Sequence, residues 1–491
     1  MQTLLEELPD TSSAVIILIR PDRSIPASTG DESHQQALRK SAYDPSAVFI
    51  LELATTLAIR DSDVLAKTGQ AVADALHNAI RSSTNTHPLM LSRVVAYLLR
   101  LMRVSQAHSF VRAPIILHTI SGFDPSVLET TASSTLKGLS TCVEDPGPLR
   151  NEICNIPDFW SILQAHVAVP EAGSLVFDLL NSVIAGQPPA ITADNYEPAV
   201  ALLNNFATAG KIGASIEQKR DRNARAQKPL KTAKPRENQV VDRGYRALAS
   251  IHQLTSRVPA LIKQSHLERD EAWITYWSPI FKTLRTQCLN PCREIRHQAL
   301  SWLQRSLLSP DLASPDHLEW TAIFSEVLFP LLSRLMRPEI WQMDPVGMSE
   351  TRVQAATLLC KVFLHYLFWL SEWDGMLDLW LKILDVLDQL LKSGENESLE
   401  EAVPESLKNM LLVMLDGGYL DIPQEGHKPS PMWEQTWSRI EKFLPSMYKD
   451  IFQDRNAKST QREDEGPVLK AYNEGQEQEQ QGLVGDGPEK V

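Results

Sequence analysis

The chain has 491 residues, of which 43% are hydrophobic and 22% charged, and its net charge at pH 7 is −13. This length exceeds what one compact domain usually holds, so we expect at least two folded blocks with sizeable cores. The acidic total disfavours a protein that coats nucleic acid, and we expect no nucleic-acid partner.

Residues 1–40 contain Pro21, Pro26 and a polar stretch, and are predicted to form a flexible lead-in. The apolar run 14–19 is short and follows acidic residues, so it is not typical of a secretory signal. The chain has only five, unevenly spaced cysteines, which favours a reducing compartment over a disulfide framework. Both features favour a cytoplasmic location.

Residues 41–210 are predicted to form a first helical block, which opens at Asp44-Pro45. Apolar residues recur at steps of three and four, and no hairpin turn lies between alternating β-branched runs. The chain is therefore predicted to be all-α.

Residues 211–243 differ in composition, with many cations and few large apolar residues. They are predicted to form a basic disordered linker, because such a segment cannot form a core. Its interpretation stays open between a solvated linker, contact with anionic lipid or an acidic partner, and nucleic-acid or nuclear-import contact. The candidate contact residues are Lys219, Arg220, Arg222, Arg225, Lys228, Lys231, Lys234 and Arg236.

Residues 244–453 are predicted to form a second helical block. Over 377–391 leucines and Trp380 follow one helical face, with charged residues mainly on the other. Two segments have the pattern of the second helix of a HEAT-type repeat: Asn290-Pro291 before Arg296, and Ser349 before Arg352. In each the arginine could bridge to the next turn or repeat. The pattern favours an α-solenoid of stacked HEAT/armadillo-like helical pairs in two blocks.

The second block has few residues in patterns typical of a metal-binding or catalytic site. Cys288 and Cys292 with His297 could be imagined as a zinc site, but a fourth ligand and a CxxC knuckle are missing, so buried cysteines are favoured. The sequence has no phosphate-binding glycine motif and no hydrolase or metalloprotease motif. We therefore expect no cofactor, no metal and no enzyme. The tryptophans after residue 270 are expected mainly in the core, although one or two could bind a partner.

The last predicted helix of high apolar content is 402–415, with Pro404 in its first turn and Gly417-Gly418 as its stop. The longest apolar stretch, 362–370, is too short to cross a bilayer, so no transmembrane segment is predicted. Residues 454–491 are predicted to form a disordered acidic tail.

Four segments, at 317–335, 350–367, 402–415 and 432–445, resemble the last part of the large Golgi ARF guanine-nucleotide exchange factors, which include the Golgi brefeldin-A-resistance, Gea and GNOM proteins. A weaker likeness extends upstream to 44–65 and 87–103. The resemblance implies the helical region that follows the catalytic Sec-seven domain. No segment resembles that domain, so no exchange residue is assigned.

The resemblance further implies a regulatory and docking role in vesicle-mediated transport between the ER and the Golgi, with peripheral attachment to Golgi membranes. Its implied partners are small GTPases of the ARF and Rab type and the membrane itself. A freestanding helical scaffold or transport adaptor remains the alternative, and the chain could be either a piece of a larger exchange factor or a separate product. The sequence leaves the oligomeric state open.

Overall fold

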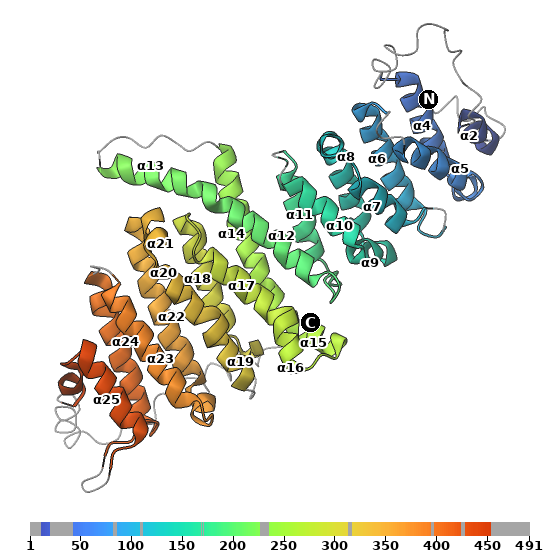
Figure 1. Ribbon diagram of the computed structural model, residues 1–491. Coiled ribbons are helices and arrows are strands. Elements are labelled where there is room, and N and C mark those ends of the chain that lie inside the picture. The colour runs from blue at the N-terminus through green and yellow to red at the C-terminus, as the bar shows by residue number, and fades with distance from the viewer. Residues whose placement is uncertain are drawn as a thin grey trace, which may run out of the picture. The chain divides into compact units, whose positions relative to one another are not determined.

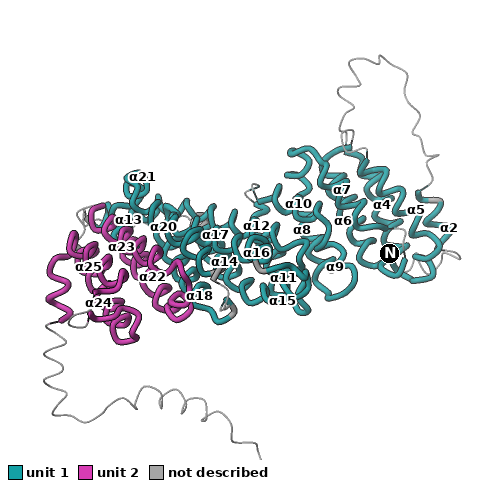
Figure 2. Tube along the Cα trace, turned by 60° about the horizontal axis from the view of Figure 1, so that its bottom comes forward, with its two compact units in different colours: residues 1–351 teal, residues 352–491 magenta. Residues whose placement is uncertain are grey.

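A computed structural model describes residues 11–19, 43–81, 86–108, 111–167, 169, 171–225, 235–312, 317–393, 397–423 and 428–452, and every element in these ranges is a helix (Figure 1). The all-α prediction is confirmed. The chain divides into two compact units between Thr351 and Arg352 (Figure 2).

The helices of the first unit are α2 (Thr11–Ile19), α4 (Pro45–Ala58), α5 (Ser62–Arg81), α6 (Pro88–Val104), α7 (Ala113–Ser121), α8 (Pro125–Glu144), α9 (Pro148–Asn155), α10 (Pro157–Val167), α11 (Gly173–Ala185), α12 (Tyr196–Ala209), η2 (Gly210–Ile212), α13 (Gly213–Arg225), α14 (Pro235–Thr255), α15 (Val258–Ser265), α16 (Arg269–Ala272), η3 (Trp273–Trp277), α17 (Ser278–Gln287), α18 (Arg293–Leu307), η4 (Pro310–Leu312), α19 (His317–Ala322), η5 (Ile323–Leu328), α20 (Phe329–Leu335) and α21 (Pro338–Met343). Helix α22 (Pro345–Ser371) contains the division between the units, and α23 (Met376–Lys392), α24 (Glu397–Asp416) and α25 (Pro431–Phe443) follow it.

Helices of the first unit pack mainly on helices that lie near them in the chain. α6 packs on α5 and α8, α12 on α14, and α14 on α18. Leu99 and Leu139 are completely buried between α6 and α8, as their apolar spacing requires. This arrangement is a solenoid-like stack of helices, as the repeat pattern predicted.

Local sequence signals start many of these helices. Asp44 accepts hydrogen bonds from the backbone N–H groups of Ser46 and Ala47, at 2.9 and 3.2 Å, and Pro45 occupies the first helical position of α4. Helix α2 lies within the predicted lead-in and packs on α4 and α5, so the prediction of a wholly flexible 1–40 was wrong for 11–19.

Two π-helical segments in the first unit allow proline to follow without breaking a helix. In η3 the N–H of Ser278 bonds to the carbonyl of Trp273, and in η5 that of Phe329 bonds to Phe324, each five residues back. Pro279 and Pro330 come directly afterwards. The wider turn rearranges the carbonyls that a proline cannot satisfy, so both helices continue.

The structure corrects the predicted break at 211–243. α13 and the start of α14 are helical there, and α14 packs on both α12 and α18 within the first unit. The division between compact units lies instead after Thr351. Residues 226–234 are outside the described part of the chain.

Gly244 allows α14 to cross closely over the end of α12. A Cβ atom at this position would lie 3.1 Å from the carbonyl oxygen of Phe206 and 3.1 Å from Cδ1 of Ile295. The Cα of Gly210 would be only 3.4 Å away. The first unit is therefore continuous across the predicted linker because two glycines meet at this crossing.

We expect Gly244→Val to destabilise the first unit by about 1–3 kcal/mol, because its side chain would overfill this crossing. Urea unfolding followed by tryptophan fluorescence measures the change. Gly122→Val is the control, since Gly122 is exposed and a Cβ there would meet its nearest atom at an ordinary 3.5 Å. Equal effects of the two substitutions would contradict the close-crossing argument.

The second unit packs α23 against α24 and α25. Trp380 is fully buried in α23, its ring stacks on Phe363 with centroids 5.2 Å apart, and its indole N–H donates to Oγ1 of Thr436 at 2.8 Å. The prediction that tryptophans serve mainly the core is confirmed here and for Trp273 and Trp277 in the first unit.

Helix α24 begins earlier than its sequence indicated. It starts at Glu397, so Pro404 lies inside the helix and not in its first turn. The proline deprives the carbonyl of Glu400 of its helical donor, and Glu400 is an exposed residue. The predicted stop is confirmed, since Gly418 has φ of 72° and the N–H of Leu420 bonds back to the carbonyl of Met414.

Among the described residues, α22 is the one helix with the length and apolar content to cross a bilayer. It extends well beyond the apolar stretch 362–370 that was judged too short. However, 56% of its most apolar window is buried within the protein. The core helix of a soluble protein has the same composition, so this feature alone does not indicate a membrane span.

Candidate functional site: helix α13 and its carboxylate clamp

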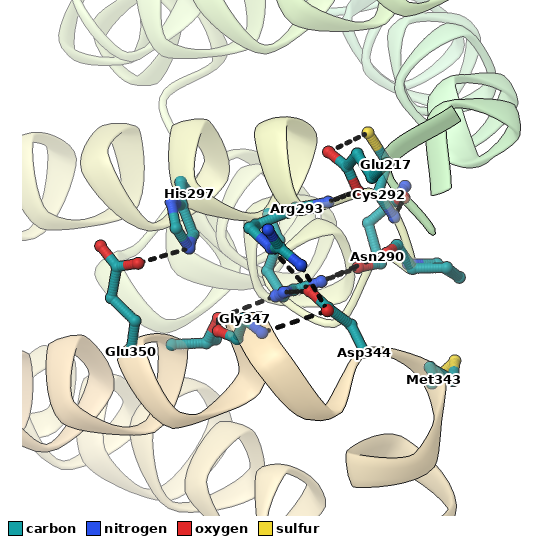
Figure 3. A network of polar contacts seen from close by, with 12 residues as sticks. Glu217, Asn290, Cys292, Arg293, His297, Met343, Asp344, Gly347 and Glu350 are labelled. Carbon is teal, nitrogen blue, oxygen red and sulfur yellow. Dashed lines mark hydrogen bonds and ion pairs between the residues drawn. The ribbon is translucent and has the colours of Figure 1, made fainter. Parts of the chain in front are cut away.

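Glu217 of α13 caps the N-terminus of α18 from outside that helix (Figure 3). Its Oε2 accepts from the backbone N–H of Arg293 at 2.8 Å, and its Oε1 from that of Glu294 at 3.1 Å. Cys292, the residue at the N-cap position of α18, offers no side-chain cap. A carboxylate is favourable here because the first turn has unpaired N–H groups and a positive helix-dipole end.

Asp221, one turn further along α13, binds the side chain of Arg293. Its Oδ2 accepts from Nη2 of Arg293 at 3.0 Å. The same guanidinium forms two bonds to Asp344, from Nε to Oδ2 at 3.0 Å and from Nη2 to Oδ1 at 2.7 Å. Arg293 therefore joins α13 to the start of α22 inside the first unit, and we call Glu217, Asp221 and Arg293 the carboxylate clamp.

Asp344 lies between two arginines. The fully buried Arg296 donates from Nη2 to Oδ2 of Asp344 at 2.5 Å, and the N–H of Gly347 donates to Oδ1 at 3.1 Å. Burial by itself would raise the pKa of the Asp344 carboxyl, but the hydrogen bonds from Arg293 and Arg296 outweigh it and hold this pKa well below its usual range. Asp344 is thus a fixed anion that caps α22.

Asn290 supports the turn before α18. Its Oδ1 accepts from the N–H of Cys292 at 3.0 Å, and its Nδ2 donates to Oε1 of Gln287 at 2.8 Å. Gln287 in turn donates to Asn204 of α12 at 2.7 Å. This chain of amides fixes the residues that present the clamp to α13.

Away from these two carboxylates, α13 carries exposed cations. Lys219, Arg220 and Arg222 are all exposed, whereas Glu217 and Asp221 bind α18. The structure thus places four of the eight predicted contact residues on one helix, α13, and three of them have exposed side chains. Arg225 and Arg236 lie at the end of α13 and near the start of α14, and Lys228, Lys231 and Lys234 lie outside the described residues.

The acidic half of this site was not predicted from the sequence. Glu217 and Asp221 are four residues apart and so share one face of a helix, which was the available signal. The prediction of disorder for this segment concealed it.

The described residues also include a Ser-His-Asp group, but its connections do not suit catalysis. Ser121 Oγ donates to Oδ1 of Asp158 at 2.6 Å, and Nδ1 of His118 lies 3.3 Å from Oδ2 of Asp158. A nucleophilic serine would instead need its hydrogen bond to histidine. This group connects α7 to α10.

The three candidate zinc ligands, Cys288, Cys292 and His297, each have different neighbours. Cys292 Sγ lies 3.4 Å from Oε1 of Glu217, and Nε2 of His297 lies 3.8 Å from Oε2 of Glu350. Cys288 is completely buried, which raises its thiol pKa. No group of three or more possible ligand residues is found among the residues that the structure describes.

Comparison with known families gives a match for residues 277–447 to the GBF1-like tetratricopeptide repeat region. This part of the chain is similar to a GBF1-like repeat region. It includes Arg293, Arg296 and Asp344, while α13 precedes it. The resemblance to the large Golgi ARF exchange factors is thereby confirmed for this part of the chain.

Curated relatives agree with the GBF1-like assignment. The chain is 39% identical over 178 residues to the Golgi-specific brefeldin A-resistance guanine nucleotide exchange factor 1 homolog of Caenorhabditis elegans, covering 36% of this chain and 9% of the relative. It is 33% identical over 186 residues to the ARF guanine-nucleotide exchange factor GNOM of Arabidopsis thaliana, covering 37% and 13%. With ARF guanine-nucleotide exchange factor 2 of Saccharomyces cerevisiae it shares 24% over 241 residues, covering 49% and 15%. The matches thus span at most about a seventh of these relatives.

Among solved structures, a circular tandem repeat protein aligns with 94% of this chain and 89% of its own at 14% identity, with a TM-score of 0.20. At that score the two backbones do not superpose as one fold.

Proposed function

We propose that this chain acts as a regulatory and docking helical-repeat region of a Golgi ARF guanine-nucleotide exchange factor. It would work in vesicle-mediated transport on the cytoplasmic side of Golgi membranes, attached peripherally, with GTPases of the ARF and Rab type as its protein partners. The match of 277–447 to the GBF1-like repeat region supports the exchange-factor context. The docking part of the proposal is supported by α13.

The observation that carries docking is the separation of charge on α13. Its two carboxylates bind the N-terminus of α18 and Arg293, so its exposed cations are not neutralised by them. A basic surface of this kind attracts anionic lipid headgroups. The chain as a whole carries −13, so such a surface is where we expect it to approach a negative membrane.

Vesicle sedimentation at physiological salt tests this proposal. We expect the purified chain to bind vesicles that contain phosphatidylserine and to lose affinity when Lys219, Arg220 and Arg222 are all changed to glutamine. Each cation near the surface contributes about 1 kcal/mol, so the combined loss should reach tenfold or more. Binding should weaken further as salt increases, because screening shortens the range of the attraction.

The matched control is Arg93→Gln with Arg100→Gln and Lys137→Gln, which removes three exposed cations from α6 and α8. If both triple variants lose affinity equally, or if neither does, α13 is not the docking surface. In a separate assay, acceleration of GDP release from ARF by the chain alone would contradict the proposed non-catalytic role.

A further inference from the structure

Helix α13 is fixed in rotation about its own axis by contacts along one side. Glu217 and Asp221 hold the start of α18 and Arg293, one turn apart. At its first residue, Gly213 approaches α18 so closely that a Cβ would lie 2.6 Å from Sγ of Cys292. Three anchors spread over two turns leave little freedom to rotate.

This fixed rotation makes the exposed cations unequal. At about 100° per residue, Lys219 and Arg222 lie about 200° and 140° round the helix from Glu217, which places them opposite the clamp. Arg220 lies about 60° from Glu217 and lines a hollow of about 210 Å³ together with Val241 and Glu294. Lys219 and Arg222 can therefore reach one flat surface together, whereas Arg220 is directed along the flank of the unit.

An apolar side chain accompanies this basic face. Ile212, directly before α13, keeps 41% of its surface exposed. Cations beside an exposed apolar residue are typical of helices that lie on a lipid surface, where the apolar group enters the headgroup boundary. This combination favours lipid over an acidic protein as the partner.

We infer that the carboxylate clamp presents α13 to an anionic lipid surface in one fixed orientation, with Lys219 and Arg222 facing the lipid and Arg220 turned aside. Glu217, Asp221 and Arg293 are then positioning residues, which act on lipid contact only through the orientation of α13. This inference rests on the proposed docking function and assigns the geometry of the same surface.

Single substitutions in two backgrounds test the orientation, with binding to phosphatidylserine vesicles as the readout. In the native chain, we expect Lys219→Gln to reduce vesicle affinity about fivefold and Arg220→Gln less than twofold. In a chain that also carries Glu217→Ala and Asp221→Ala, α13 is no longer held in one orientation. Lys219→Gln and Arg220→Gln should then reduce vesicle affinity by the same factor. Glu129→Ala with Glu171→Ala gives the same change of charge away from the clamp and should preserve the native difference.

Hydrogen exchange establishes that the clamp variant remains folded: faster exchange is expected for the amides of α13 and for those of Arg293 and Glu294, with the rest of the first unit unchanged. If the variant fails to fold, Asp221→Ala alone replaces it, since it removes one of the two carboxylate anchors and should narrow the difference between Lys219→Gln and Arg220→Gln.

The possible results separate the two ideas. If neither Lys219→Gln nor Arg222→Gln weakens binding in the native chain, the docking function itself is wrong. If Lys219→Gln weakens vesicle binding more than Arg220→Gln, and the ratio of the two losses is the same in both backgrounds, the docking function stands and the fixed orientation is overturned. Binding to a polyglutamate peptide without binding to vesicles would overturn lipid as the partner.

Discussion

Replacing Arg296 by methionine is expected to lower the free energy of unfolding of the first unit by about 3–5 kcal/mol, the cost of removing one partner from a buried ion pair. Arg296 has no exposed surface. It donates to Oγ1 of Thr351 at 2.8 Å, to the carbonyl of Asn290 at 2.8 Å and to Asp344 at 2.5 Å. Methionine fills a similar volume but removes the donor to the Asn290 carbonyl and one of the two arginines that pair with Asp344, which then keeps Arg293 and the N–H of Gly347.

Urea unfolding of the whole chain would measure this loss, and hydrogen exchange of the amides of α18 would assign it to the first unit. Arg296→Lys should give an intermediate loss, because lysine keeps a positive charge but cannot reach three acceptors in different directions. A change below about 1 kcal/mol for methionine would contradict a structural role for the pair.

Acid provides an independent check on the same pair. A carboxyl whose pKa is depressed by folding stabilises the protein fully above its unfolded pKa, and this contribution is lost as pH falls through the folded pKa. Hydrogen bonds from Arg293 and Arg296 hold the pKa of the Asp344 carboxyl well below the usual value for an aspartate, which is near 3.9. The difference between native and Arg296→Met chains should therefore be constant at neutral pH and shrink below about pH 4.

The bridging arginine could be predicted from the sequence, but its main partner could not. Asn290-Pro291 before Arg296 has the pattern of a repeat helix, which indicated an arginine able to reach the next repeat, and Arg296 does reach Thr351. Asp344 lies 48 residues away, in a short connection with no local pattern to mark it. Only the packing of α18 against the start of α22 brings the two together.

The prediction of a disordered linker was wrong for a related reason, namely contacts between segments that are far apart in the sequence. A segment with many cations and few apolar residues cannot form a core, and this reasoning still holds for α13. The helix is held instead by its two carboxylates and by a close glycine contact with α18. These contacts need the N-terminus of α18, which composition does not reveal. The contact role of the candidate cations stays a prediction, and the sorting of charge around α13 required the structure.

The start of α24 shows a smaller limit of local signals. A proline favours the first turn of a helix, so Pro404 predicted a start near residue 402. In the structure the helix begins at Glu397, and buried Leu399 and Val403 secure the turns that precede the proline. Tertiary packing therefore outweighs the local cost of an internal proline.

In the second unit, Trp380→Ala is expected to cost about 3–5 kcal/mol, the usual range for truncating a fully buried tryptophan. Trp380 has no exposed surface and connects three helices, because its ring stacks on Phe363 of α22 while its indole N–H bonds Thr436 of α25. Alanine would leave a cavity and leave Thr436 without this donor. Urea unfolding measures the loss, and faster hydrogen exchange in α23 and α25 would assign it to the second unit.

Two companion substitutions separate the contributions of Trp380. Trp380→Phe keeps a ring that can stack on Phe363 but loses the hydrogen bond, so it should cost less than alanine. Thr436→Val keeps the tryptophan and leaves its indole N–H buried without an acceptor, which should cost about 1–3 kcal/mol. If Thr436→Val is neutral while Trp380→Ala is severe, the ring stack and the filled volume alone secure α25. If Trp380→Ala itself costs under about 1 kcal/mol, α25 is held by other contacts, and Trp380 is not the centre of this core.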